Sequence, residues 1–123
     1  MIVSAQQKPV TVRPALEWAV ILPEDMEYRI ASCRVLAVAK ALERVLITLD
    51  TPGGYRTEGR VQGPVLPYCV VDNLISPPMA IAETLDRITA ALLMNQLHRI
   101  DPNNKTRYTI RATKDLDYME GKA

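Results

Sequence analysis

The sequence predicts an α+β fold: a two-layer sandwich in which two helices cover one face of an antiparallel sheet. Short segments with alternating apolar residues, typical of strands, recur along the chain, and two longer segments carry apolar residues at helical spacing. In chain order these segments read strand, helix, strand, strand, helix, strand. With right-handed crossovers, this order gives the ferredoxin-like βαββαβ arrangement.

The composition is that of one globular domain. The chain has 123 residues, of which 48 % are hydrophobic and 24 % are charged, and its formal net charge is +1. Single domains commonly contain about 100–150 residues. We expect an extended N-terminal arm over residues 1–14, one α+β domain over 15–113 and a polar C-terminal tail over 114–123. No internal repeat is visible in the sequence.

Prolines and alternating valines shape the start of the chain. Pro9 and Pro14 block helix formation, and Val10 and Val12 alternate with polar residues, so the arm can form a short edge strand. The segment LEWAVIL, residues 16–22, then alternates in the way typical of a strand and predicts the first strand of the domain.

The segment from residue 23 to 44 supports two interpretations. It opens with proline and three acidic residues and closes on Lys40 and Arg44, a charge order that favours a helix. The alternative is a hairpin with strands at 29–38 and 44–50. The chain would then form a small β-barrel or a curled antiparallel sheet capped by one long helix, residues 77–100. Residues 44–50 are predicted to be a strand in both interpretations.

A glycine-rich stretch, DTPGGYRTEGRVQGP at residues 50–64, raises the question of phosphate binding. Gly54 and Gly59 have a spacing close to that of a phosphate-binding loop. However, Arg60 and Val61 stand where such a loop needs lysine and a hydroxyl residue, and no helix follows. We therefore expect this stretch to turn the chain between two strands.

The last third of the chain contains the clearest helical pattern. After a short strand at 67–71, Ser76 suits an N-cap and Pro77 the first helical position. Apolar residues then recur every three or four positions, which predicts a helix over 77–100. Alternation over 106–113 predicts the final strand.

Few residues suggest catalysis or metal binding. Cys33 and Cys69 are far apart, and together with the single histidine, His98, they cannot complete a structural zinc site. No nucleophile motif is present. We therefore expect no catalytic residue, metal or cofactor. If the protein is instead a small enzyme of unknown reaction, it would have to use Asp72, His98 or Tyr68.

In the ferredoxin-like arrangement, arginines gather with apolar residues on the sheet face away from the helices. Because arginine is enriched in protein interfaces, this face predicts a non-enzymatic binding or assembly module that self-associates or binds a protein partner. An accessory or structural component of a larger assembly, such as a virion or a mobile element's machinery, would fit. The predicted face contains Arg44, Arg56, Arg60, Arg107, Arg111, Ile21 and Leu46, and the predicted assembly arm contains Val10, Val12 and Arg13.

A nucleic-acid-binding module is the main alternative, since the same arginines could bind backbone phosphates. The positions of Trp18, Tyr55 and Tyr108 predict that these rings point into the core, which argues against base stacking. No signal peptide is visible, and no apolar run reaches the roughly 18 residues of a membrane span. We expect a soluble cytoplasmic protein, free or virion-associated, with no membrane partner.

Overall fold

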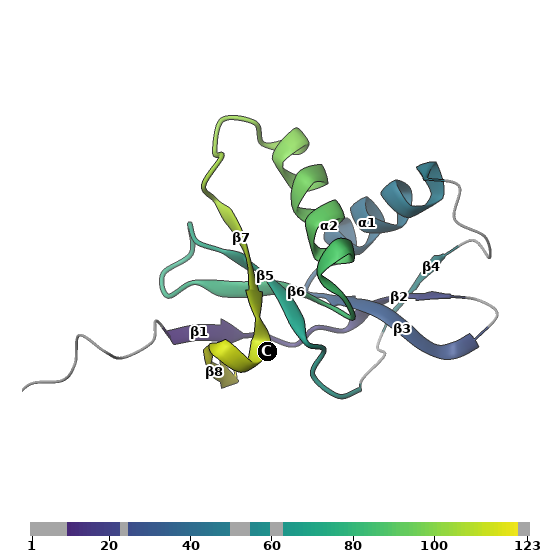
Figure 1. Cartoon of the computed structure of the whole chain (residues 1–123), viewed down its shortest axis with the longest axis horizontal. Coiled ribbons are helices and arrows are strands. Elements are labelled where there is room, and N and C mark those ends of the chain that lie inside the picture. The colour runs from purple at the N-terminus through teal and green to yellow at the C-terminus, as the bar shows by residue number, and fades with distance from the viewer. Residues whose placement is uncertain (1–9, 23–24, 50–54, 60–62, 121–123) are drawn as a thin grey trace, which may run out of the picture.

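Eight strands and two α-helices make up the part of the chain that the computed structural model describes, residues 10–22, 25–49, 55–59 and 63–120 (Figure 1). The elements, in chain order, are β1 (Val10–Arg13), β2 (Trp18–Leu22), β3 (Asp25–Cys33), α1 (Leu36–Thr48), β4 (Arg56–Glu58), β5 (Tyr68–Asp72), β6 (Met79–Thr84), α2 (Arg87–Ile100), β7 (Tyr108–Ala112), a 3-10 helix (Thr113–Asp115) and β8 (Asp117–Glu120).

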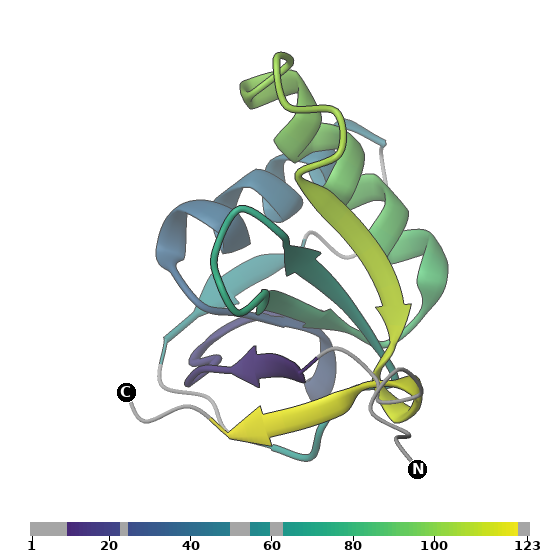
Figure 2. The same cartoon turned by 90° about the vertical axis from the view of Figure 1, so that its left-hand side faces the viewer.

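The strands form one open, largely antiparallel sheet. Its main path runs β4-β2-β3-β6, and β5 and then β7 continue from β6. Strand β1 pairs with the first residue of β6, Met79, and also with β8, and both pairings are parallel. Both helices lie on one side of the central strands, and β1 and β8, which continue the sheet from β6, lie on the other side of them (Figure 2). Both faces of the central strands are therefore covered, unlike the open face that the sequence predicted.

The fold contains an internal repeat of a ββαβ unit. Elements β2, β3, α1 and β4 form the first half, and β5, β6, α2 and β7 form the second. In each half the first strand lies between the second strand and the strand that follows the helix. Each hairpin also shifts register at the same place, between Val20 and Ile21 in β2 and between Val70 and Val71 in β5.

The two halves join through β3 and β6. Their pairing is symmetric around Ser32 and Glu83, which lie opposite one another. Two flanking hydrogen bonds repeat across this centre: the Arg34 amide donates to the carbonyl of Ile81 (2.9 Å), and the Leu85 amide donates to the carbonyl of Ile30 (2.8 Å). The halves are thus related by an approximate two-fold axis through this strand pair.

The helices bury equivalent residues in one shared core. A fully buried leucine contributes about 1.5–3 kcal/mol to folding through removal of its apolar surface from water. The same side chains occupy equivalent positions in both halves, which explains why α1 and α2 pack similarly on the sheet. The equivalent buried pairs are Ala39 and Ala90, Leu42 and Leu93, and Leu46 and Leu97.

Several predictions about the elements are corrected. The α+β class, with two helices on one side of a mainly antiparallel sheet, is confirmed, but the strand order is not ferredoxin-like and the open sheet is not a barrel. Asp25–Cys33 is a strand because it pairs with β2 on one side and β6 on the other, and these contacts outweigh local helix propensity. The first helix starts only at Leu36 and ends at Thr48, so it includes most of the segment predicted to be a strand at 44–50.

The predicted helix at 77–100 also starts late. Met79–Thr84 pairs as β6 with β3 and β5, and the helix begins after Asp86, whose side chain accepts a hydrogen bond from the Thr89 amide (2.7 Å). Of the stretch at 50–64 that was predicted to turn the chain between two strands, residues 50–54 and 60–62 lie outside the described residues. The stretch follows helix α1 and not a strand, and β4, which lies within it, pairs with β2.

Candidate binding groove on the helix layer

The arginines predicted to share one sheet face are separated in the structure. Arg44 and Leu46 lie on α1. Arg56 lies on the edge strand β4, and Arg107 directly precedes another edge strand, β7. Leu46 and Ile21 are buried, so neither side chain is available to a partner. Arg60 lies outside the described residues. The predicted basic face is thus not assembled, because α1 occupies the place expected for a strand.

The predicted assembly arm is partly bound within its own molecule. Val10, Val12 and Arg13 belong to β1, and Arg13 reaches the carboxylate of Glu83, which is fully buried on β6. The Arg13 Nε and Nη2 atoms lie 2.6 and 3.1 Å from the two Glu83 oxygens. The Leu66 amide also donates to Glu83 (3.3 Å). This two-pronged contact gives the buried charge the partner that it requires.

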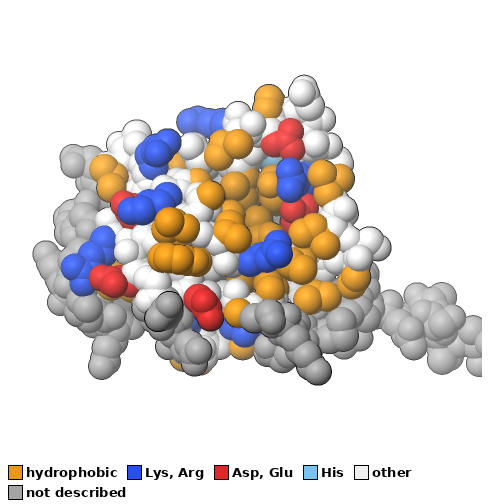
Figure 3. Space-filling model, turned by 180° about the vertical axis from the view of Figure 1, so that it is seen from behind, with side chains coloured by type: hydrophobic (Ala, Val, Ile, Leu, Met, Phe, Trp, Pro, Cys, Tyr) orange, Lys and Arg blue, Asp and Glu red, His pale blue; other side chains and the backbone are white. Residues whose placement is uncertain are grey.

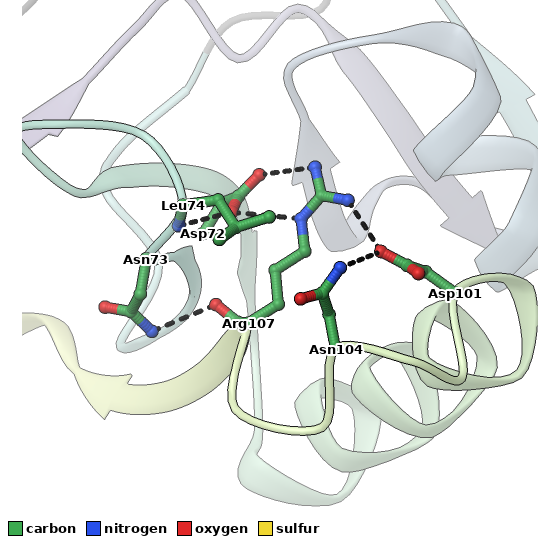
Figure 4. A network of polar contacts seen from close by, with 6 residues as sticks. All are labelled: Asp72, Asn73, Leu74, Asp101, Asn104 and Arg107. Atoms are coloured by element: carbon green, nitrogen blue, oxygen red, sulfur yellow. Dashed lines mark hydrogen bonds and ion pairs between the residues drawn. The ribbon is translucent and has the colours of Figure 1, made fainter.

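Arg107 is held in a polar network between β5, β7 and the end of α2 (Figure 4). Its Nε and Nη2 atoms lie 3.1 and 3.0 Å from the two oxygens of Asp72, and its Nη1 lies 3.1 Å from Asp101. The hydrogen bonds from Asn104 and Arg107 hold the pKa of Asp101 below its usual value. The guanidinium also lies 5.0 Å from the centre of the Tyr108 ring. This arrangement fastens the edge of the sheet.

Of the residues proposed for an enzyme, Asp72 and His98 both lie next to Tyr108, whereas Tyr68 does not. Tyr68 and Asp72 lie at opposite ends of β5, and Asp72 is engaged by Arg107. His98 packs against Tyr108, with the ring centres 5.7 Å apart. Burial raises the pKa of both cysteine thiols to about 12, so they stay protonated and unreactive at neutral pH. Among the described residues, no three metal-binding side chains gather.

A groove of about 360 Å³ lies between the C-terminal halves of α1 and α2. It contains apolar, amide and hydroxyl groups together with two arginines, and its residues come from equivalent stretches of the two helices. The groove therefore lies where the two halves of the fold meet. Its lining residues are Arg44, Val45 and Thr48 of α1, Leu49 directly after α1, and Leu92, Asn95, Gln96 and Arg99 of α2.

Charge and exposed apolar surface distinguish this groove. Within the part of the chain that the structure describes, no carboxylate forms an ion pair with Arg44 or Arg99. Around the groove, Ile47 and Leu49 are each 54 % exposed and Ile100 is 66 % exposed. Figure 3 shows hydrophobic side chains over the middle of the face opposite the view of Figure 1, with both basic and acidic side chains among them. The lining of the groove itself contains two arginines and no acidic residue.

Among the residues that line the groove, only Arg44 was predicted from the sequence to be a binding residue. Residues 44–50 were predicted to be a strand, so the proximity of Arg44 to Arg99 was not expected. One signal was present, since Ile47, Leu49 and Ile100 are large apolar residues outside the buried helical stripe. Exposed apolar residues that gather in one patch are typical of an interaction site.

No known protein family matches this chain, and no curated protein or solved structure does so either. Within the described residues, neither helix combines the length and the apolar character that a membrane span requires.

Proposed function

We propose that this protein is a non-enzymatic protein-binding module, an adaptor or accessory component of a larger assembly. Its groove between α1 and α2 receives an acidic segment of a partner protein that also carries apolar side chains. The supporting observation is the pair of arginines, Arg44 and Arg99, that line an otherwise apolar and amide-rich groove without a carboxylate partner among the described residues.

The chemistry of the groove favours an acidic and apolar partner. Arginine forms two-pronged hydrogen bonds with carboxylates, and these bonds set orientation as well as attraction. The exposed side chains of Ile47, Leu49 and Ile100 would lose contact with water on binding, which supplies a non-directional contribution. Nucleic acid is less well supported, because Trp18 and Tyr55 pack against the core and are not free for base stacking.

Two designed helical peptides test this proposal. Both carry the same leucine face, and one has glutamate and the other lysine at its polar positions. We expect the glutamate peptide to bind more tightly by fluorescence polarisation, with an affinity that weakens as salt is added. The double variant R44E/R99E should reverse the preference, with a loss of roughly tenfold or more for the glutamate peptide.

A matched control separates the groove from net charge. The double variant K105E/K114E changes the total charge equally at exposed positions outside the groove and should keep the original preference. The proposal is wrong if neither peptide binds, or if both double variants behave alike. Binding of a single-stranded oligonucleotide that is lost only in R44E/R99E would replace it with nucleic-acid binding.

A further inference from the structure

Strand β7 leaves one edge of the sheet open. It pairs with β5 on one side, and among the described residues no strand pairs with its other side. Figure 2 shows β7 running along the border of the sheet. An open edge presents backbone N–H and C=O groups that can pair with another chain.

The hydrogen bonds at the two ends of β7 show which groups point outward. The Asn73 amide donates to the Arg107 carbonyl (2.8 Å), and the Thr113 amide donates to the Pro67 carbonyl (2.8 Å). Because direction alternates along an antiparallel strand, the backbone groups of Thr109 and Arg111 also face β5. The N–H and C=O groups of the intervening residues, Tyr108, Ile110 and Ala112, therefore point away from the sheet.

We infer that β7 pairs antiparallel with β7 of a second copy of this chain, centred on Ile110, to form a symmetric dimer with one continuous sheet. In this register Ile110 lies opposite its own copy, and Tyr108 lies opposite the small Ala112. Thr109 lies opposite Arg111, so no two arginines face one another. All five residues of β7 take part, and the three outward N–H groups of each copy find carbonyl partners.

Two features favour a second copy over an open filament. A two-fold pairing uses the same edge on both copies and therefore closes after two chains. The two other edge strands of the described sheet, β4 and β8, have only three and four residues, and Arg56 of β4 forms an ion pair with Glu58 (3.0 Å). The groove on the helix layer contains no residue of β7, so this inference is independent of the proposed peptide binding.

The variant Ala112→Pro tests the backbone pairing directly. Ala112 has a φ of −72°, which a proline ring accepts, and its N–H points away from β5. Proline should thus fit the folded monomer while removing one outward donor per copy and crowding the edge. We expect sedimentation velocity to show a concentration-dependent dimer for the unaltered protein and a monomer for Ala112→Pro, with circular dichroism unchanged. A monomer before substitution, or a dimer unaffected by proline, would overturn the inference.

The register is tested by a matched pair of variants at one position. Thr109→Glu and Thr109→Lys both lose the hydrogen bond from the Asn73 side chain (3.1 Å), so their effects on folding should be similar. In the dimer, however, glutamate would face Arg111 of the second copy and lysine would place like charges opposite each other. We expect the dimer of Thr109→Glu to have a Kd about tenfold below that of Thr109→Lys. Equal or inverted values would contradict pairing centred on Ile110.

Discussion

The two ββαβ halves of this protein share a core but differ in the polar contacts that fasten it. Ala39 and Leu42 of α1 have identical, equally buried counterparts in α2, whereas the central strand pair joins Ser32 of the first half to Glu83 of the second. The buried apolar positions therefore repeat together with the fold, whereas the polar residues at equivalent positions differ between the halves.

The second half carries more side-chain contacts at its ends. Its edge strand β7 is tied to β5 and to the end of α2 through Arg107. In the first half, β4 has the more exposed Arg56–Glu58 pair and one hydrogen bond from Thr57 to Glu43 of α1. Helix α2 has an Asp86 cap, whereas α1 begins after Val35 without a side-chain cap. We therefore expect the second half to be the more resistant to local opening, and three pairs of variants test this contrast.

The largest difference is expected at the strand pair that joins the halves. Glu83→Gln removes the buried charge that binds Arg13, and breaking such a pair should reduce the free energy of unfolding by about 3–5 kcal/mol. Ser32→Ala, at the equivalent position, loses one hydrogen bond from Arg29 (2.5 Å) and should cost about 1 kcal/mol. Urea unfolding followed by circular dichroism measures both. Similar losses for the two variants would show that Glu83 does not anchor the second half.

A smaller difference is expected between the two edge strands. Asp72→Asn weakens the buried two-pronged contact with Arg107 and should cost about 2 kcal/mol. Glu58→Gln acts on a pair that is largely exposed to water and should change stability by less than about 0.5 kcal/mol. The same unfolding experiment applies, and the contrast between the edges fails if Glu58→Gln is as damaging as Asp72→Asn.

The smallest expected effects concern the helix starts. Asp86→Ala should cost about 1 kcal/mol because the Thr89 amide loses its side-chain acceptor. Conversely, Val35→Asp should stabilise the protein by roughly 0.5–1 kcal/mol. Val35 is exposed and has the extended backbone angles of an N-cap, but its side chain cannot accept a hydrogen bond from the helix. Thermal unfolding would detect both changes. A destabilising Val35→Asp would mean that α1 does not gain from the cap that α2 uses.

Local patterns in the sequence were sufficient to predict the α+β class and the type of several elements. Strands at 16–22 and 106–113 were recognised by alternation, and most of α2 by apolar residues at helical spacing. The inward positions of Trp18 and Tyr55 were also predicted correctly. These features depend on neighbours within a few residues, so they can be read without knowing where distant segments lie.

What the sequence alone determined, then, is which segments are amphipathic and which residues are apolar enough to be buried. The tertiary structure decided the state of residues 25–33, whose pairing with β2 and β6 outweighs their helical character. It also decided that Arg13 would bind Glu83 and that Arg44 would lie in one groove with Arg99. The physical reason is that pairing and burial between distant segments depend on how the whole chain closes, whereas periodicity reports only the preference of each segment by itself.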